Sequence, residues 1–335
     1  MIAMMLFVIV VLSLSTGAAG SSSSSSSSCT NDTTTCAPSG PLSACVATWC
    51  PTVSTVYLDS SNAFTGTIPP SLGSLALRVR LELLDMDLTG TLPSSLGSLS
   101  NLSSRIILEN LPHVTGTLPS SLGSLTALLG ALVVQNMPIA GTIPNSVVSL
   151  SNLQSAFVLQ GLNLTGTIPT ALGLAMSNLQ NYVFMQDLDI SGTLPSSFGS
   201  LWRLAEVFSF ERLPYMTGTI PPSIGSLTAL TSALELEEVP FTGTIPSSLG
   251  SLSSLHSLFV LRELNLTGTI PPSLSSLHVG ELFAIQDMPI TGTIPSVLGS
   301  FIRMNTAFAL EGLALTGSFF ATTTIVCLGI CIIIV

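Results

Sequence analysis

Lysine is absent from this chain of 335 residues, and charge of either sign is scarce. Seven basic residues, all arginine, stand against 17 acidic residues and give a formal net charge of -10. A nucleic-acid partner is not expected, because phosphate backbones are bound by clustered lysine and arginine. The same shortage of positive charge argues against docking on an anionic membrane leaflet.

Long apolar runs are missing from the middle of the chain, where Gly, Pro, Ser and Thr recur every few residues. This interruption argues against a polytopic membrane protein, although 47% of the residues are hydrophobic. An apolar stretch from Ile2 to Leu14, followed by small residues, predicts a secretory signal peptide over residues 1–20. An uncleaved signal anchor is the alternative.

The second apolar run lies at the carboxyl end. Residues 319–335 carry no charge and predict either a transmembrane segment or the removable signal of a lipid anchor. A third interpretation is that the sequence stops before a C-terminal cap of the domain. Cys327 and Cys331 lie in this segment and are interpreted as free thiols. We therefore expect a protein of the cell surface, anchored in the membrane by its C-terminus, or a secreted one.

Cysteine is concentrated near the other end. Eight serines at residues 21–28 form a low-complexity linker, and the four cysteines that follow define an N-terminal cap over residues 29–55. In an exported protein, Cys29, Cys36, Cys45 and Cys50 are expected to form two disulfides, in one of three alternative pairings. A zinc site is the competing interpretation, but this segment contains neither a Cys-x-x-Cys motif nor a histidine.

Catalytic patterns are also missing. His113, His256 and His278 share no surrounding motif, and no phosphate-binding glycine loop or metal-spaced His/Cys cluster is present. We therefore predict no enzyme activity, no metal and no cofactor.

What the chain does contain is a repeat. A Thr-Gly-Thr tripeptide or a close variant recurs every 24 to 26 residues, with its glycine at 66, 90, 116, 141, 166, 192, 218, 243, 268, 292 and 317. The segment from Gln154 to Leu172, QSAFVLQGLNLTGTIPTAL, shows one unit. Phe157 and Leu159 alternate as on a strand, Gly166 permits a bend, and Pro169 ends the pairing. A period in the twenties with leucine at constant places is typical of leucine-rich repeats.

Two apolar columns run through all the units. The first consists of Leu81, Ile106, Leu132, Phe157, Val183, Phe208, Leu234, Phe259, Phe283 and Phe308, and the second of Leu83, Leu108, Val134, Leu159, Met185, Phe210, Leu236, Leu261, Ile285 and Leu310. Stacked units would bury both columns in one core. The sequence therefore predicts, over residues 56–318, an α/β-type repeat fold of mostly strands and turns. This is a right-handed leucine-rich-repeat solenoid of ten to eleven repeats with a parallel sheet on its concave face.

The L-T-G-T-I-P and S-L-G-S-L elements resemble the plant-type leucine-rich repeats of receptor kinases and polygalacturonase inhibitors. Those families place an asparagine in the turn after the strand, and this chain keeps it only at Asn62. Later units have an apolar residue there: Met86, Leu111, Met137, Leu162, Leu188, Leu213, Val239, Leu264, Met288 and Leu313. This form, as in VLQGLNLTGTIP, is similar to the leucine-rich surface antigens of kinetoplastid protozoa. That resemblance implies a signal peptide, cysteine-containing flanks and a membrane or lipid anchor.

Polar residues occupy the two positions after each strand, and we expect them to form a stripe along the edge of the concave sheet. The candidate partner-binding residues are Glu109, Gln135, Gln160, Gln186, Asp187, Glu211, Arg212, Glu237, Glu238, Arg262, Glu263, Gln286, Asp287 and Glu311. Mixed carboxylates, amides and arginines suit a protein or glycan ligand, although solvated strand ends would need polar side chains in any case. The middle of each strand is apolar and is expected to be exposed, at Ile107, Val133, Val158, Phe184, Val260, Ala284 and Ala309.

These features favour a cell-surface recognition or adhesion protein, most simply a monomeric solenoid. An inhibitor or co-receptor that acts on a partner protein is the first alternative, and a self-associating coat protein is the second. Four Asn-x-Ser/Thr triplets, at Asn31, Asn101, Asn163 and Asn265, are candidate glycosylation sites in an exported protein.

Overall fold

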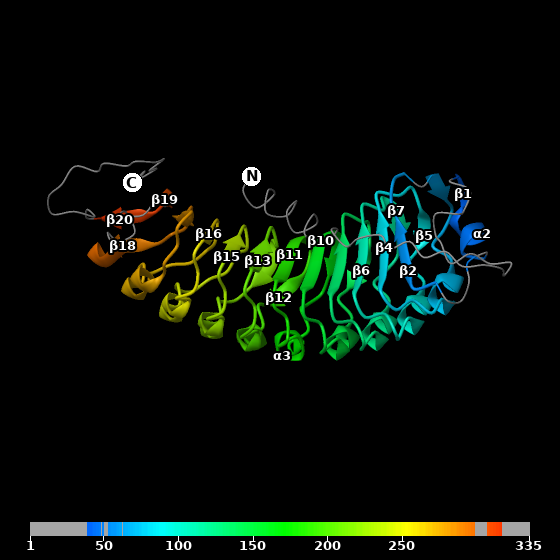
Figure 1. Cartoon of the computed structure of the whole chain (residues 1–335). Coiled ribbons are helices and arrows are strands. Elements are labelled where there is room, and N and C mark those ends of the chain that lie inside the picture. The colour runs from blue at the N-terminus through cyan, green and yellow to red at the C-terminus, as the bar shows by residue number, and fades with distance from the viewer. Residues whose placement is uncertain (1–38, 48, 50–52, 62, 299–306, 317–335) are drawn as a thin grey trace.

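The computed structural model describes residues 39–47, 49, 53–61, 63–298 and 307–316. These residues form one curved solenoid, an arc whose inner side carries a long sheet and whose outer side carries short helical turns (Figure 1). The predicted signal peptide, the serine linker and the C-terminal segment lie outside the described residues.

One parallel sheet runs the length of the arc. Its strands are β2 (Thr55–Leu58), β4 (Arg80–Leu84), β6 (Arg105–Glu109), β8 (Ala131–Gln135), β10 (Ala156–Thr165), β11 (Tyr182–Leu188), β13 (Val207–Glu211), β15 (Ala233–Glu237), β16 (Leu258–Arg262), β17 (Leu282–Gln286) and β19 (Ala307–Glu311). They lie side by side in chain order, and from β4 onward each contributes the same five positions to the pairing, while β2 contributes the first four. The prediction of a leucine-rich-repeat solenoid with a parallel sheet is confirmed.

The second and fourth strand positions point into the core. Every member of the two apolar columns is buried, from Leu81 and Leu83 to Phe308 and Leu310. Phe259, Phe283 and Phe308 stack on one another, with ring centroids 5.1 and 5.0 Å apart. Because parallel strands place identical positions about 4.8 Å apart, a column of large apolar side chains becomes a continuous interior.

The outer side consists of short turns built on the Pro-x-Ser-Leu-Gly-Ser sequence. These are the 3-10 helices η2 (Pro70–Ser74), η3 (Ser94–Ser98), η4 (Ser120–Ser124), η5 (Asn145–Ser149), η6 (Ser196–Ser200), η7 (Pro222–Ser226), η8 (Ser247–Ser251) and η9 (Pro272–Ser276), with the α-helix α3 (Leu172–Ala175) in one unit. In six of these turns, η3, η4, η5, η7, η8 and η9, a serine hydroxyl donates to a carbonyl of the preceding unit, as Ser248 Oγ does to the Pro222 carbonyl over 2.6 Å. Seven of the turns have glycine at the contact, where an added Cβ would lie 2.0–2.5 Å from a backbone or side-chain atom of the next unit, whereas η5 and η9 have Val148 and Ser275 there.

Between the sheet and the outer turns, the Thr-Gly-Thr elements form a second ladder. Its strands are β3 (Ala63–Thr65), β5 (Thr89–Thr91), β7 (His113–Thr115), β9 (Ala140–Thr142), β12 (Ser191–Thr193), β14 (Tyr215–Thr217), β18 (Thr291–Thr293) and β20 (Ala314–Thr316), with β1 (Ser39–Pro41) beside β3. The first threonine hydroxyl donates to the preceding unit's glycine carbonyl, at 3.1 Å from Thr165 Oγ1 to Gly141 O. The glycine itself has positive φ, 74° at Gly166, which explains the recurrence of glycine there.

An N-terminal cap closes one end of the core. Helix α2 (Leu42–Val46) buries Leu42 and Val46, and Trp49 is buried beside them. Cys45 is disulfide-bonded, while Cys29, Cys36 and Cys50 lie outside the described residues. Within the described part of the chain, no helix is long and apolar enough to cross a membrane.

We expect Gly225→Ala to destabilise the protein. A Cβ atom at this position would lie 2.2 Å from the Ser248 carbonyl oxygen of the next unit, so two backbones would have to separate. Overpacking of this kind costs about 1–3 kcal/mol. The exposed neighbour Ser226→Ala is the control and should change stability by less than about 0.5 kcal/mol. Urea unfolding followed by circular dichroism measures both, and equal midpoints for the two variants would contradict close stacking of the turns.

Candidate partner-binding face

Three rows of side chains lie on or beside the side of the main sheet that faces away from the core. We name them by their place in each strand: the middle row (third position), the fifth row and the turn row (sixth position, directly after the fifth). The fifth row consists of Leu84, Glu109, Gln135, Gln160, Gln186, Glu211, Glu237, Arg262, Gln286 and Glu311, which the strand register places side by side. The structure thus aligns the fifth-row residues predicted from the sequence.

Hydrogen bonds and ion pairs connect much of the fifth row. The Gln160 amide donates to Gln186, whose Nε2 donates to Glu211 Oε2 over 2.6 Å. Further along, Arg262 pairs with Glu237, and Gln286 Nε2 donates to Glu311 over 3.1 Å. These side chains are buried or half-buried, so the row is an ordered polar column rather than a set of independent solvated side chains.

The same row contains buried polar atoms without a hydrogen-bond partner. They are both amide atoms of Gln135, Oε1 of Gln160 and Nε of Arg262. Among the described residues only Trp49 Nε1 shares this condition. Gln135 lies close enough to Glu109 to lower the pKa of that carboxyl, but burial outweighs this and raises the pKa overall. Unpaired buried polar atoms are costly, so this row is the part of the sheet whose hydrogen bonding is least complete among the described residues.

A backbone constraint governs the turn row. Asp85, Asn110, Asn136, Gly161, Asp187, Arg212, Glu238, Glu263, Asp287 and Gly312 all have φ between 49° and 64°. This left-handed conformation favours glycine, asparagine and aspartate and disfavours other residues. Local backbone geometry therefore explains most of the row. It does not explain Arg212, Glu238 and Glu263, three long charged side chains in successive units.

The turn row also connects adjacent units through its backbone. Its backbone N–H groups donate to the fifth-row carbonyl of the next unit, as from Asp85 to Glu109 over 3.0 Å and from Glu238 to Arg262 over 3.0 Å. The apolar residues that follow, such as Met86 and Leu111, are buried in the core. Units with an apolar residue in place of the plant-type asparagine are thus connected by backbone hydrogen bonds at this turn.

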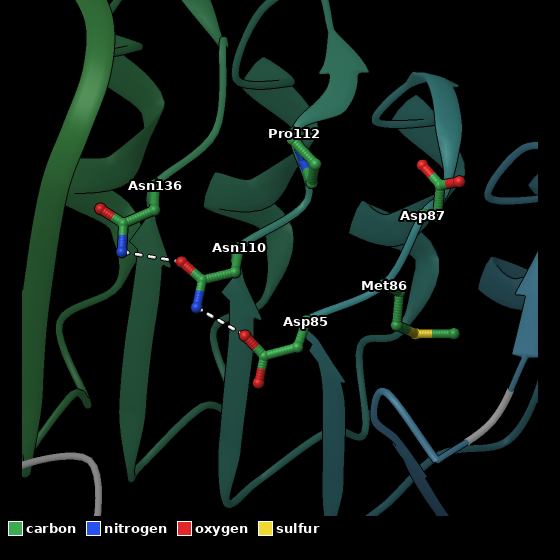
Figure 2. A pocket seen from close by; sticks show the side chains of 6 residues that line it. All are labelled: Asp85, Met86, Asp87, Asn110, Pro112 and Asn136. Atoms are coloured by element: carbon green, nitrogen blue, oxygen red, sulfur yellow. Dashed lines mark hydrogen bonds between the residues drawn. The ribbon is translucent and has the colours of Figure 1, made fainter.

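At one end of the turn row lies an open hollow lined by Asp85, Met86, Asp87, Asn110, Pro112 and Asn136. Figure 2 shows two consecutive side-chain hydrogen bonds in this hollow: the Asn136 amide donates to Asn110 Oδ1, and the Asn110 amide donates to Asp85 Oδ1. The two donor–acceptor distances are 2.8 and 2.6 Å. Since these amides and the acid satisfy one another, the hollow offers a ligand few free polar groups.

Most side chains of the middle row are buried, contrary to the expectation from the sequence. Ile107, Val133, Val158, Phe184, Val260 and Ala284 are 1–7% exposed and Ala309 is half-buried, so the prediction of an exposed apolar row is wrong. Equivalent side chains of adjacent strands pack against one another and form two separate clusters. Between the clusters the row is polar, with Ser209 on β13 and Glu235 on β15.

Charge is concentrated at this polar break. Glu211, Glu235 and Glu237 are all buried, and two arginines lie beside them, Arg262 in the fifth row and Arg212 in the turn row. Burial, with the neighbouring carboxylates of Glu211 and Glu237, raises the pKa of Glu235 from 4.5 to about 8. The Arg212 guanidinium donates two hydrogen bonds to the Asp187 carboxylate, over 2.6 and 2.9 Å.

The remaining predicted sites are dispersed. His113, His256 and His278 are exposed, and His113 lies 3.4 Å from Asp87. Within the described ranges, no three His, Cys, Asp or Glu side chains are grouped so as to hold a metal ion. Asn101, Asn163 and Asn265 are exposed, and Asn31 lies outside the described residues.

We expect Glu238→Asn to stabilise the protein by about 0.5–1 kcal/mol. The reason is that Glu238 has φ of 51°, a left-handed conformation that asparagine tolerates better than glutamate does. Glu238→Gln removes the same charge without this backbone preference and serves as the control. Thermal unfolding of both variants measures the difference. Equal stability of the Asn and Gln variants would show that φ is not the constraint at this position.

A second prediction concerns pH. Because the folded-state pKa of Glu235 lies near 8 and the ordinary value is 4.5, the folded protein retains a proton that the unfolded chain releases between these values. The stability from this group is complete below about pH 4.5 and is lost as the pH rises towards 8. Glu235→Gln should therefore flatten the decline of the urea midpoint between pH 5 and 8 and should raise the midpoint at pH 8. An unchanged decline would refute the raised pKa.

Solved structures resemble the chain, whereas no protein-family model and no curated protein sequence matches it. A TDR receptor structure aligns with a TM-score of 0.66 and 26% identity, over 75% of this chain and 42% of the receptor. A plant ice-binding protein aligns with a TM-score of 0.59 and 24% identity, over 80% of this chain and 82% of that one. A leucine-rich-repeat protein of Leptospira interrogans aligns with a TM-score of 0.51 and 22% identity, over 75% and 64% of the two chains. The chain thus spans less than half of the receptor, and what these proteins share with it is the leucine-rich-repeat solenoid.

Proposed function

We propose that this chain is an exported, surface-held recognition protein that binds a partner along the concave face of its solenoid. The observation that carries the proposal is the fifth row, an aligned polar column that crosses the sheet and retains unpaired buried atoms at Gln135, Gln160 and Arg262. A partner that reaches these atoms would supply the missing hydrogen bonds. The exposed turn-row charges, Asp187, Glu238, Glu263 and Asp287, border the same column.

The concave face suits recognition better than catalysis. Its polar groups are spread along a column at the strand spacing of about 4.8 Å rather than converging on one reacting atom. A solenoid offers an extended surface to an extended partner, and each unit adds one set of contacts. The resemblance to a TDR receptor supports a recognition role, since that protein is by name a receptor.

Several sequence features support an extracellular site of action. They are the predicted signal peptide over residues 1–20, the cysteine-containing cap with its disulfide-bonded Cys45, and the apolar segment at residues 319–335 that would anchor the chain. Disulfides persist in oxidising compartments. The similarity to kinetoplastid leucine-rich surface antigens, carried by the L-x-x-L-x-[LIV]-[TS]-G-T-[IL]-P form, points to the same location. We infer that Asn101, Asn163 and Asn265 are accessible to glycosylation there.

A binding screen of the purified chain against arrayed extracellular proteins and glycans tests the proposal. The variant Asp187→Ala, Arg212→Ala, Glu238→Ala, Glu263→Ala should bind the partner at least about ten-fold more weakly, because each change removes a contact from the rim of the column. The control variant Asp189→Ala, Arg203→Ala, Glu206→Ala, Glu281→Ala removes the same number and net charge of side chains outside the turn row and its hollow.

The two variants separate specific recognition from general electrostatics. Wild-type affinity in the control and weakened binding in the turn-row variant would support the concave face. Equal loss in both variants, or none in either, would contradict it. Light scattering of the unliganded protein distinguishes a self-associating coat protein, which would form large assemblies without any partner.

A further inference from the structure

Three buried glutamates lie at the polar break of the middle row, Glu211, Glu235 and Glu237, and among the described residues only Glu235 of these three has no hydrogen bond or ion pair. Its side chain is 3% exposed, and the described structure gives it no hydrogen bond and no ion pair. Glu211, by contrast, accepts from Ser209 Oγ over 2.8 Å and from Gln186 Nε2 over 2.6 Å. Glu237 is paired with Arg262. Its carboxyl oxygens are not among the fully enclosed unpaired atoms, so a group outside the described residues can reach the Glu235 carboxyl and supply the contact that the neighbouring side chains do not make.

The same protein shows how a glutamate in the middle row is satisfied. Glu82 occupies the third position of β4, as Glu235 does in β15, and it is 1% exposed. Two guanidinium groups reach its Oε1 atom, Arg105 Nε at 2.6 Å and Arg80 Nη1 at 3.4 Å. Arg80 begins the strand of Glu82 and Arg105 begins the next strand. A middle-row carboxylate in this sheet is thus paired with cations from the first strand position.

At Glu235 both of these cations are missing. The first positions of its own strand and of the next strand are occupied by Ala233 and Leu258, which pair with each other in the register as Arg80 and Arg105 do. Arg262 is the nearest arginine in the two strands, but its ion pair is with Glu237. Glu235 thus occupies the same strand position as Glu82, but no arginine stands at the two first positions beside it.

We infer that Glu235 receives the guanidinium or ammonium group of an arginine or lysine side chain carried by a polypeptide partner. This inference rests on the proposed concave-face recognition and makes the partner a protein with a basic anchor residue. The carboxylates of Glu211 and Glu237 act on Glu235 from the neighbouring positions and would add to the attraction for a cation. A guanidinium supplies planar donors to a carboxylate, which is the geometry that Arg105 provides at Glu82.

The surroundings of Glu235 also suit the rest of such a side chain. Val207, Ala233, Leu258 and Val260 form an apolar cluster on the same face of the sheet. The methylene stems of arginine and lysine pack on apolar surface while their charged ends contact acids. Binding of a cation would also deprotonate Glu235, whose pKa lies near 8 in the unliganded protein, so complex formation at pH 7 would release a proton.

The test selects peptides from a random dodecapeptide display library on the immobilised full chain, and in parallel on Leu258→Arg. The substituted arginine has the same position relative to Glu235 as Arg105 has relative to Glu82. Its guanidinium should therefore pair with Glu235 and leave no place for a basic side chain of the peptide. The wild-type pool should be enriched in arginine or lysine at one position, and the Leu258→Arg pool should lose that enrichment. Leu282→Arg is the control. It adds the same charge at the first position of β17, but the middle residue of the strand before it, β16, is Val260 rather than a glutamate. This variant should keep the wild-type preference for a basic residue.

A selected peptide then gives the quantitative readout. Replacing its basic residue by citrulline, which is neutral and of arginine's shape, should weaken binding to the wild type at least about ten-fold and binding to Glu235→Gln much less. Calorimetry in two buffers of different ionisation enthalpy should detect proton release on the wild type and its loss in Glu235→Gln. Enriched peptides without a basic position, or a citrulline effect that persists in Glu235→Gln, would overturn the inference while leaving concave-face binding intact. If neither the library nor the extracellular array yields a binder, the proposed function fails and this inference with it.

Discussion

The physical constraint on which the molecule depends is the in-register pairing of parallel strands. Each strand places its five positions beside the same five positions of the next unit, so any preference that a position has is repeated along the solenoid. Apolar positions become a continuous core, and polar positions become columns. A single unit could bury neither its leucines nor its phenylalanines, and the stack is therefore the unit of stability.

A second constraint, the left-handed turn after each strand, shapes the surface next to the sheet. It selects asparagine, aspartate and glycine in most units and orients the backbone N–H toward the carbonyl of the next unit. Against this background, Arg212, Glu238 and Glu263 stand out, because each accepts a backbone conformation that its side chain disfavours. They occur in successive units beside the polar break of the middle row. The strained positions and the charged positions of the concave face thus coincide.

Two buried glutamates illustrate how much the surroundings of a side chain decide. Glu82 and Glu235 share a strand position, a depth of burial and a sheet. Arginines from neighbouring first positions surround the former, whereas Ala233 and Leu258 occupy those positions beside the latter. The first arrangement is complete within the chain and contributes to the structure. The second has an acid without a base, and this difference sets β13, β15 and β16 apart from the rest of the concave face.

The sequence by itself determined the period, the two core columns and the alignment of the polar residues, because these follow from spacing along the chain and every unit repeats them. Leu81 to Phe308 could be assigned to the interior without coordinates. The tertiary structure alone decided the φ of the turn row, the burial of Ile107 and Val158, and the pairing of Glu82 but not Glu235. These properties depend on which side chains adjacent units bring within a few ångströms of one another, and a pattern within one unit does not contain that information.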